Sequence, residues 1–169
     1  TATYSTTNGA ALLSATSFGY PGDYVMVQLD TSIVLRSVRF YVRDGYGYRG
    51  PGLFRIYGTN NASEYASPTW SLAQWTLVHD NAVLRTYKLN NATNEGNQKI
   101  PVQPDKGPFS IYVLVVQQLA SSASSDGILN LMEWELYGTE CRVGTIFSPL
   151  AQACVACRSE EHTSELQSP

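Results

Sequence analysis

The chain has 169 residues, of which 43% are hydrophobic, so it can bury one substantial core but is too short for two ordinary domains. Charged residues make up only 15%, and 11 tyrosines stand among many Ser, Thr, Asn and Gly residues, a balance typical of strands joined by polar turns. The net charge is -3, and the 11 Lys and Arg residues are spread along the chain. Because phosphates are neutralised by clustered cations, this charge pattern argues against binding to nucleic acid.

The sequence contains no candidate membrane span. Its longest strongly apolar run, Ile111 to Val116, is far shorter than the roughly 20 residues that cross a bilayer as a helix. The chain begins at Thr1 without a Met and without a charged-then-apolar leader, so we expect any signal or anchor to lie outside this sequence.

Two stretches in the first quarter of the chain alternate with the period of a strand: residues 24–29 (YVMVQL) and residues 35–42 (LRSVRFYV). In the second stretch, Arg39 and Tyr41 share one face. The opposite face carries Val38, Phe40 and Val42. This pattern predicts a half-buried strand with one side in the core and one side in solvent.

Residues 43–52 (RDGYGYRGPG) hold four glycines and a proline, which the interior of a strand or helix does not accept. We therefore expect an exposed loop there. Residues 53–58 (LFRIYG) resume the strand alternation, residues 59–69 are polar, and residues 75–78 form a short predicted strand.

The second half of the chain alternates polar stretches with two strong predicted strands. Residues 87–89 are a weak strand candidate, and residues 90–107 are polar with several Gly and Pro. Residues 111–117 are apolar on both faces, as in a central strand. A Ser-rich loop over residues 118–127 precedes a closing strand over residues 129–137. One face of this closing strand carries Met132, Trp134 and Leu136.

About seven short strands, with turn signals between them and no amphipathic helix, predict an all-β fold built as an antiparallel sandwich or barrel. Period-2 spacing places a set of apolar side chains on inward faces, and we expect them to form one continuous core. They are Val25, Val27, Leu29, Val38, Phe40, Phe54, Ile56, Val113, Val115, Trp134 and Leu136.

The order of four sequence segments carries a family resemblance. They are 24–43 (YVMVQLDTSIVLRSVRFYVR), 54–65 (FRIYGTNNASEY) followed by WTLVHD, 109–118 (FSIYVLVVQQ) and 129–138 (LNLMEWELYG). Together they resemble the discoidin or factor V/VIII type C domain, also called galactose-binding-like, over about two thirds of the chain. The resemblance implies an eight-stranded jelly-roll β-sandwich whose loops at one end bind sugars, phospholipid head groups or protein partners.

One element of that family is missing. Its members usually carry an early D-G-x-x-x-T-x-W segment that closes the sandwich and often helps to hold a structural calcium ion, and residues 1–22 contain none. Either the sequence begins inside the domain or this subgroup lacks the element. A structural calcium ion is therefore left open, and no other cofactor is expected.

We divide the chain into a discoidin-like sandwich (1–139) and a short Cys-rich extension (140–157, ECRVGTIFSPLAQACVAC). The extension resembles the opening of an ephrin-receptor-like or tumour-necrosis-receptor-like Cys-rich repeat. The resemblance implies disulfide bonds for Cys141, Cys154 and Cys157. A zinc site built on the C-x-x-C pair is the alternative.

Residues 158–169 (RSEEHTSELQSP) are polar, lack apolar periodicity and resemble translated sequencing-adapter DNA. We expect this tail to be disordered and to belong to no domain, the alternative being an authentic disordered acidic tail. Without it, His79 is the only histidine of the chain.

The sequence offers little for catalysis, and we expect a protein that is not an enzyme. A Ser or Cys nucleophile needs a base, and His79 is interpreted as a turn residue at the end of a strand. Glu133 and Glu135 share one face of the closing strand at about 6.6 Å, near the spacing used by inverting glycosidases. Two carboxylates on one strand cannot flank a sugar, so we interpret them as part of a solvated face.

Two N-glycosylation sequons, at Asn61 and Asn91, fall in segments predicted as loops. Together with the Cys-rich extension they favour an extracellular or cell-surface glycoprotein.

The loop over residues 43–52 is the predicted ligand site. Its Tyr46 and Tyr48 stand among glycines, where strand packing does not explain them, and their rings offer apolar faces to a sugar. The remaining candidate residues are the donors Arg43 and Arg49, the acceptor Asp44, and Tyr20 from the early SFGYPGDY loop. The alternative is that the tyrosines fold back and cover the end of the sandwich.

Three functions remain open. The favoured one is a non-catalytic carbohydrate-binding or adhesion module of a larger surface protein, with a glycan or glycoprotein as partner. The others are a phospholipid- or protein-binding module of the same fold, and an accessory domain of a secreted glycoside hydrolase. Lipid-binding relatives display exposed apolar spikes and basic residues, whereas this loop offers Tyr, Arg and Asp, which favours a sugar.

Overall fold

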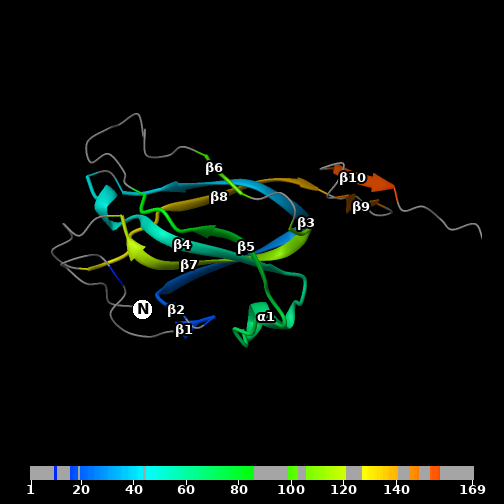
Figure 1. Cartoon of the computed structure of the whole chain (residues 1–169), viewed down its shortest axis with the longest axis horizontal. Helices are drawn as coiled ribbons and strands as arrows, with labels where there is room; N and C mark the ends of the chain where they lie inside the picture. The colour runs from blue at the N-terminus through cyan, green and yellow to red at the C-terminus, as the bar shows by residue number, and fades with distance from the viewer. Residues whose placement is uncertain are drawn as a thin grey trace, which may run out of the picture.

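The computed structural model describes residues 10, 16–18, 20–43, 45–85, 99–102, 106–120, 127–140, 145–148 and 153–156. The strands are β1 (Thr16–Ser17), β2 (Tyr20–Pro21), β3 (Asp23–Tyr41), β4 (Pro51–Thr59), β5 (Thr76–Asn81), β6 (Ile100–Pro101), β7 (Phe109–Leu119), β8 (Glu133–Glu140), β9 (Thr145–Ser148) and β10 (Ala153–Ala156). Helical structure within these residues is limited to a 3-10 turn, η1 (Gly47–Arg49), and a four-residue helix, α1 (Ser63–Ala66). The predicted all-β antiparallel β-sandwich is thus confirmed (Figure 1). None of the described helices is long and apolar enough to cross a membrane.

β3 is one strand of 19 residues, where the sequence predicts two. Its first part pairs with β7 over residues 23–28, and its last part pairs with β8 over residues 33–41. Between the two parts the register shifts, and the strand turns from one layer of the sandwich into the other (Figure 1). The polar run of Asp30, Thr31 and Ser32 at this turn separates the two apolar patterns that the sequence shows.

The two layers enclose the main core. β5, β4, β7 and the start of β3 form the first layer, and β6, β8 and the end of β3 form the second. The buried side chains between them are Leu35, Val38, Phe40, Phe54, Ile56, Val78, Ile100, Val102, Tyr112, Leu114, Val116 and Leu119. Val27, Leu29, Trp134 and Leu136 pack against this cluster, as predicted.

A second apolar cluster corrects the prediction of one continuous core. Val113 and Val115 lie with Ile111 on the other face of β7, against Phe18, Tyr57 and Trp75. The alternation of β7 sends Tyr112, Leu114 and Val116 to the main core instead. Since β7 is buried on both faces, its apolar pattern cannot by itself say which residues face which layer. Val25 is only partly buried.

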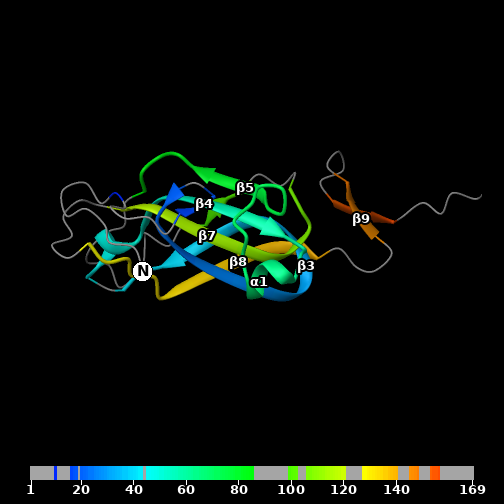
Figure 2. The ribbon, with the colours of Figure 1, turned by 90° about the horizontal axis from the view of Figure 1, so that it is seen from below.

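The segment over residues 60–75 covers the second cluster. Its α1 lies on the side of the first layer that faces away from β8 (Figure 1), the side from which Figure 2 is seen. Glu64 holds this segment together, and its side chain is only 2% exposed. Its carboxylate accepts hydrogen bonds from Thr69 N at 2.8 Å, Thr69 Oγ1 at 2.7 Å and Trp75 Nε1 at 2.7 Å. Burial alone would raise the pKa of Glu64, but these hydrogen bonds outweigh burial and hold the pKa below its usual value.

Several predicted boundaries are wrong. Pro51 and Gly52, predicted in the loop, are the first residues of β4. A proline is tolerated at the start of a strand, and a side chain at Gly52 would clash with the carbonyl of Leu119. β7 continues through Leu119, into the predicted Ser-rich loop, and β8 begins only at Glu133.

The predicted Cys-rich extension contains a small antiparallel hairpin of β9 and β10, in which Cys154 lies opposite Phe147. Cys141, Cys157 and residues 158–169 lie outside the described residues, as does the weak strand candidate at 87–89. The disulfide bonds and the disordered tail therefore stay predictions.

Replacing Tyr112 with Phe tests the turn of β3. The fully buried Tyr112 hydroxyl donates a hydrogen bond of 2.6 Å to the carbonyl of Ile33, where β3 joins the second layer. Burial raises the pKa of Tyr112, so the hydroxyl remains a donor. Tyr112→Phe leaves that carbonyl without this donor, and we expect the free energy of unfolding in urea to fall by about 1–2 kcal/mol. Tyr65→Phe, at an exposed tyrosine of α1, is the control. Equal stability of the two variants would contradict the role of Tyr112.

The pH dependence of stability tests Glu64. Because its pKa is lower in the folded than in the unfolded protein, the stability it adds is complete above the unfolded pKa and is lost as pH falls through the folded pKa. We expect the free energy of unfolding to decrease from about pH 5 to about pH 3, and Glu64→Gln to flatten this decrease. Urea denaturation at a series of pH values measures it, with Glu133→Gln, at an exposed carboxylate, as control. Parallel curves for wild type and Glu64→Gln would show that another group is responsible.

Candidate functional site

The predicted site residues that the structure describes, all but Asp44, lie at one end of the sandwich. β3 runs along β7, turns, and runs back along β8, so its start at Asp23 and its end at Tyr41 lie at the same end (Figure 1). We call it the loop end, because it carries the segment over residues 42–50. Tyr20, in β2, lies just before the start of β3, and the contacts of its side chain lie outside the described structure, as does the whole of Asp44.

The loop is held by backbone hydrogen bonds rather than by strand pairing. Tyr46 N donates to Arg43 O at 2.9 Å, and Arg49 N donates to Tyr46 O at 2.9 Å, which closes the turn at η1. Gly45 adopts a φ of 75°, a left-handed conformation that suits glycine. The neighbouring segments fix the turn, since Ala120 N donates to Gly50 O at 2.9 Å and Asn130 N donates to Arg49 O at 3.0 Å.

Four of the six predicted site residues contact one another, and we call Arg43, Tyr46, Tyr48 and Arg49 the loop cluster. The guanidinium groups of Arg43 and Arg49 lie 4.6 and 4.4 Å from the centroid of the Tyr46 ring. Arg49 also lies 5.5 Å from the Tyr48 ring, and the two tyrosine rings are 6.0 Å apart. Both tyrosines are half-buried, so their rings are neither folded into the core nor fully open to solvent.

Exposed apolar side chains that the sequence did not single out for the site accompany the loop end. Met132 is 69% exposed and precedes β8, although its spacing places it on one strand face with Trp134 and Leu136. Its backbone N–H donates to Tyr41 O at 2.8 Å, which places it at the loop end. Ile128 is 51% and Val83 is 78% exposed. For Ile128 and Val83 the signal available in the sequence was an apolar residue beside a turn, outside any alternating run, whereas Met132 continues the alternation of Trp134 and Leu136 and carries no such signal.

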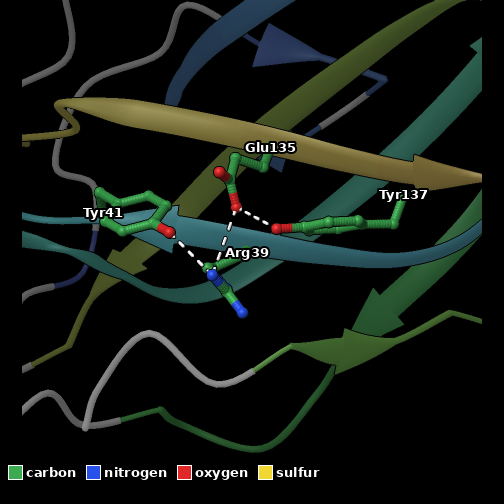
Figure 3. A network of polar contacts seen from close by, with 4 residues as sticks. All are labelled: Arg39, Tyr41, Glu135 and Tyr137. Atoms are coloured by element: carbon green, nitrogen blue, oxygen red, sulfur yellow. Dashed lines mark hydrogen bonds and ion pairs between the residues drawn. The ribbon is translucent and has the colours of Figure 1, made fainter. Parts of the chain in front are cut away.

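The two carboxylates of β8 differ in their surroundings. Glu133 is exposed, as interpreted, but Glu135 is not simply solvated. Its carboxylate accepts a hydrogen bond from the Tyr137 hydroxyl and lies 3.7 Å from Arg39 Nη1 (Figure 3). The hydrogen bond to Glu135, together with burial, raises the pKa of Tyr137.

His79 lies inside β5 opposite Ile56, so its interpretation as a turn residue is wrong. Its ring is 5.7 Å from the ring of Phe54, and burial lowers its pKa. It lines a cleft of about 500 Å³ between β5, the last residue of β6 and Lys106. The cleft is formed by Thr76, Leu77, Val78, His79, Asp80, Pro101 and Lys106.

The Asn61 sequon lies in the turn before α1. Asn61 Oδ1 accepts hydrogen bonds from Ser63 N at 3.2 Å and Ser63 Oγ at 2.7 Å, and Asn61 Nδ2 donates to Gln74 Oε1 at 3.0 Å. Asn91 lies outside the described residues, and glycosylation at both positions stays a prediction. Among the described residues, no group of three or more His, Cys, Asp or Glu is placed to hold a metal ion.

No protein-family model and no curated protein matches this sequence. Among solved structures, the chain is similar to SusE-like protein BT2857, with a TM-score of 0.54 and 12% identity over 82% of this chain and 55% of that chain. It is also similar to CBM62 from Clostridium thermocellum Xyl5A, with a TM-score of 0.42 and 15% identity over 70% of each chain. The chain thus spans about half the length of the BT2857 structure. The likeness to BT2857 shows a shared fold, and function has to be argued from the site.

Proposed function

We propose that the chain is a non-catalytic carbohydrate-binding module and that the loop cluster holds the glycan. The observation that carries this proposal is the pairing of two half-buried tyrosine rings with two guanidinium groups on an ordered loop. A tyrosine ring packs against the apolar C–H face of a pyranose, and a guanidinium donates hydrogen bonds to its hydroxyl oxygens. The loop cluster provides both contacts within a few ångströms.

The backbone of the loop supports binding because it is ordered in advance. The hydrogen bonds of Gly50 and Arg49 to the segments beside them fix the turn on which the cluster stands. Ordering side chains upon binding costs free energy, so a preformed site retains more of the contact energy as affinity. Loops positioned by a rigid sandwich are a common place for such sites.

The proposed setting is a larger extracellular or cell-surface protein of the discoidin-like kind, in which this module binds a glycan or a glycoprotein and contributes to adhesion. Glycosylation at Asn61 and Asn91, disulfide bonds from Cys141, Cys154 and Cys157, and a structural calcium ion belong to the same proposal. An accessory domain of a secreted glycoside hydrolase is a setting in which the module would bind in the same way.

Single substitutions in the loop cluster test the site. We expect Tyr48→Ala and Arg49→Ala each to weaken glycan binding by about 1–3 kcal/mol, because each removes a stacking surface or a charge-assisted donor. A glycan array identifies the ligand, and isothermal titration calorimetry measures the loss. Neither change should shift the thermal midpoint much, and Tyr65→Ala, at an exposed tyrosine of α1, should leave binding unchanged. Unaltered binding by both loop variants would place the site elsewhere.

A second candidate function is favoured by the exposed apolar side chains of the loop end. Met132, Ile128 and Val83 are exposed, and backbone hydrogen bonds of Met132 to Tyr41 and of Asn130 to Arg49 bring the first two residues to the end of the sandwich that carries Arg43 and Arg49. Exposed apolar side chains together with arginines suit the interface of an anionic membrane. If the module binds lipid head groups, it should sediment with vesicles of phosphatidylserine and phosphatidylcholine, and Met132→Ser should reduce this binding several-fold. Leu72→Ser is the control, because Leu72 is an exposed residue of the segment over residues 60–75, which covers the second apolar cluster. Binding to sugars without sedimentation would exclude this candidate.

A further inference from the structure

The outer face of the second layer carries a row of polar and aromatic side chains. In β3, Arg39 and Tyr41 alternate with core residues, and in β8 the outward positions are Glu133, Glu135 and Tyr137. Register places Arg39 directly opposite Glu135. The cluster therefore follows from the same period-2 alternation that buries Val38, Phe40, Trp134 and Leu136 on the inner face.

One connected network joins Arg39, Tyr41, Glu135 and Tyr137, and we call these four residues the sheet-face cluster (Figure 3). Arg39 Nη1 donates to the Tyr41 hydroxyl at 2.8 Å and lies 3.7 Å from Glu135 Oε2, which accepts a hydrogen bond from Tyr137. The Arg39 guanidinium lies 5.8 Å from the Tyr41 ring centroid and 5.7 Å from the Tyr137 ring centroid. At one end of the network, Lys99 Nζ lies 3.6 Å from the centroid of the Tyr137 ring.

The spacing of the two rings sets the size of a matching ligand. Tyr41 lies opposite Glu133, whereas Tyr137 lies opposite Ser37, four residues further back along β3. At the usual rise of a strand, these backbone positions are about 13 Å apart. The two rings flank the ion pair on opposite sides, so a ligand that touches both rings must be elongated.

The centre of the cluster adds directional polar groups of opposite charge. The side chains of Arg39 and Glu135 are each 29% exposed, so a ligand in solvent can reach them. A guanidinium donates to hydroxyl oxygens and a carboxylate accepts from hydroxyl groups, which is the combination that a sugar bearing several hydroxyls satisfies. The charges of Arg39 and Glu135 oppose each other, as do those of Glu133 opposite Tyr41 and Lys99 beside Tyr137, so the face does not demand a charged ligand.

We propose that the sheet-face cluster is a second glycan-binding surface, which holds a linear neutral oligosaccharide with one sugar ring over Tyr41, hydroxyls on Arg39 and Glu135, and a further sugar against Tyr137 and the Lys99 ammonium beside it. The inference rests on the proposed function as a carbohydrate-binding module but concerns a different surface from the loop cluster. It lies on the flat outside of a sheet, whereas the loop cluster lies at the end of the sandwich.

The test titrates neutral hexasaccharides of glucose, xylose, mannose or galactose into four proteins by calorimetry. They are wild type, Tyr48→Ala, Tyr137→Thr and the double variant of both. Threonine removes the ring while keeping a residue that favours strands. Tyr24→Thr is the matched control, because Tyr24 is a 44% exposed tyrosine in the first part of β3. If Tyr137→Thr fails to fold, as judged by circular dichroism, Glu135→Gln replaces it, since this change keeps size and removes the charged acceptor.

We expect at least one hexasaccharide to bind the Tyr48→Ala protein, and the double variant to bind it at least about fivefold more weakly, the loss that removal of an aromatic contact produces. The corresponding monosaccharide should bind far more weakly than the hexasaccharide. If Tyr48→Ala abolishes binding and Tyr137→Thr leaves it unchanged, the sheet-face proposal is overturned while the proposed function stands. If no neutral hexasaccharide binds wild type, the sheet-face proposal is also overturned, and the glycan array decides the proposed function separately.

Discussion

The turn of β3 from one layer into the other determines where every candidate surface lies. Its first part pairs with β7 and its last part with β8, and the hydrogen bond from Tyr112 to the carbonyl of Ile33 joins the layers at that turn. Because the strand runs back, the loop that follows it emerges at the end where the strand began. The same turn determines which face of the last part of β3 is exposed to solvent. Arg39 and Tyr41 lie on that face, because the opposite face packs against the core.

β7 is apolar on both faces, so its outer face, which lies away from the main core, must be covered by another part of the chain. The covering segment is polar in sequence, and its centre is a buried carboxylate, Glu64, which accepts a hydrogen bond from Trp75 eleven residues further along the chain. A sequence pattern marks a glutamate in a polar stretch as exposed. The partners that make its burial tolerable are supplied by the folded chain, so sequence alone could not identify this anchor.

The sequence predicted the fold class, most strands and the glycine-rich loop that carries the loop cluster, because period-2 alternation and glycine-rich turns are local signals. The contacts among the side chains of that loop came only from the structure. It failed where a residue's surroundings depend on distant segments. Met132 continues the alternation of β8 by one step but lies before the strand begins, so its side chain is exposed. His79 was taken for a turn residue because its strand was predicted too short, whereas β5 continues through Asn81. Glu135 shares a face with Glu133, but only pairing with β3 gives it Arg39 as a partner.

The loop cluster and the sheet-face cluster share one physical device, a guanidinium held over tyrosine rings. In the loop, Arg43 and Arg49 lie over Tyr46, and on the sheet Arg39 lies between Tyr41 and Tyr137. Exposed contacts of this kind add little to folding stability. They restrict long, flexible arginine side chains to a few conformations, and this restriction lowers the entropy that a ligand would have to remove. The glycan binding that we propose at both surfaces would use this device in the same way, because it orients donors beside apolar rings before a ligand arrives.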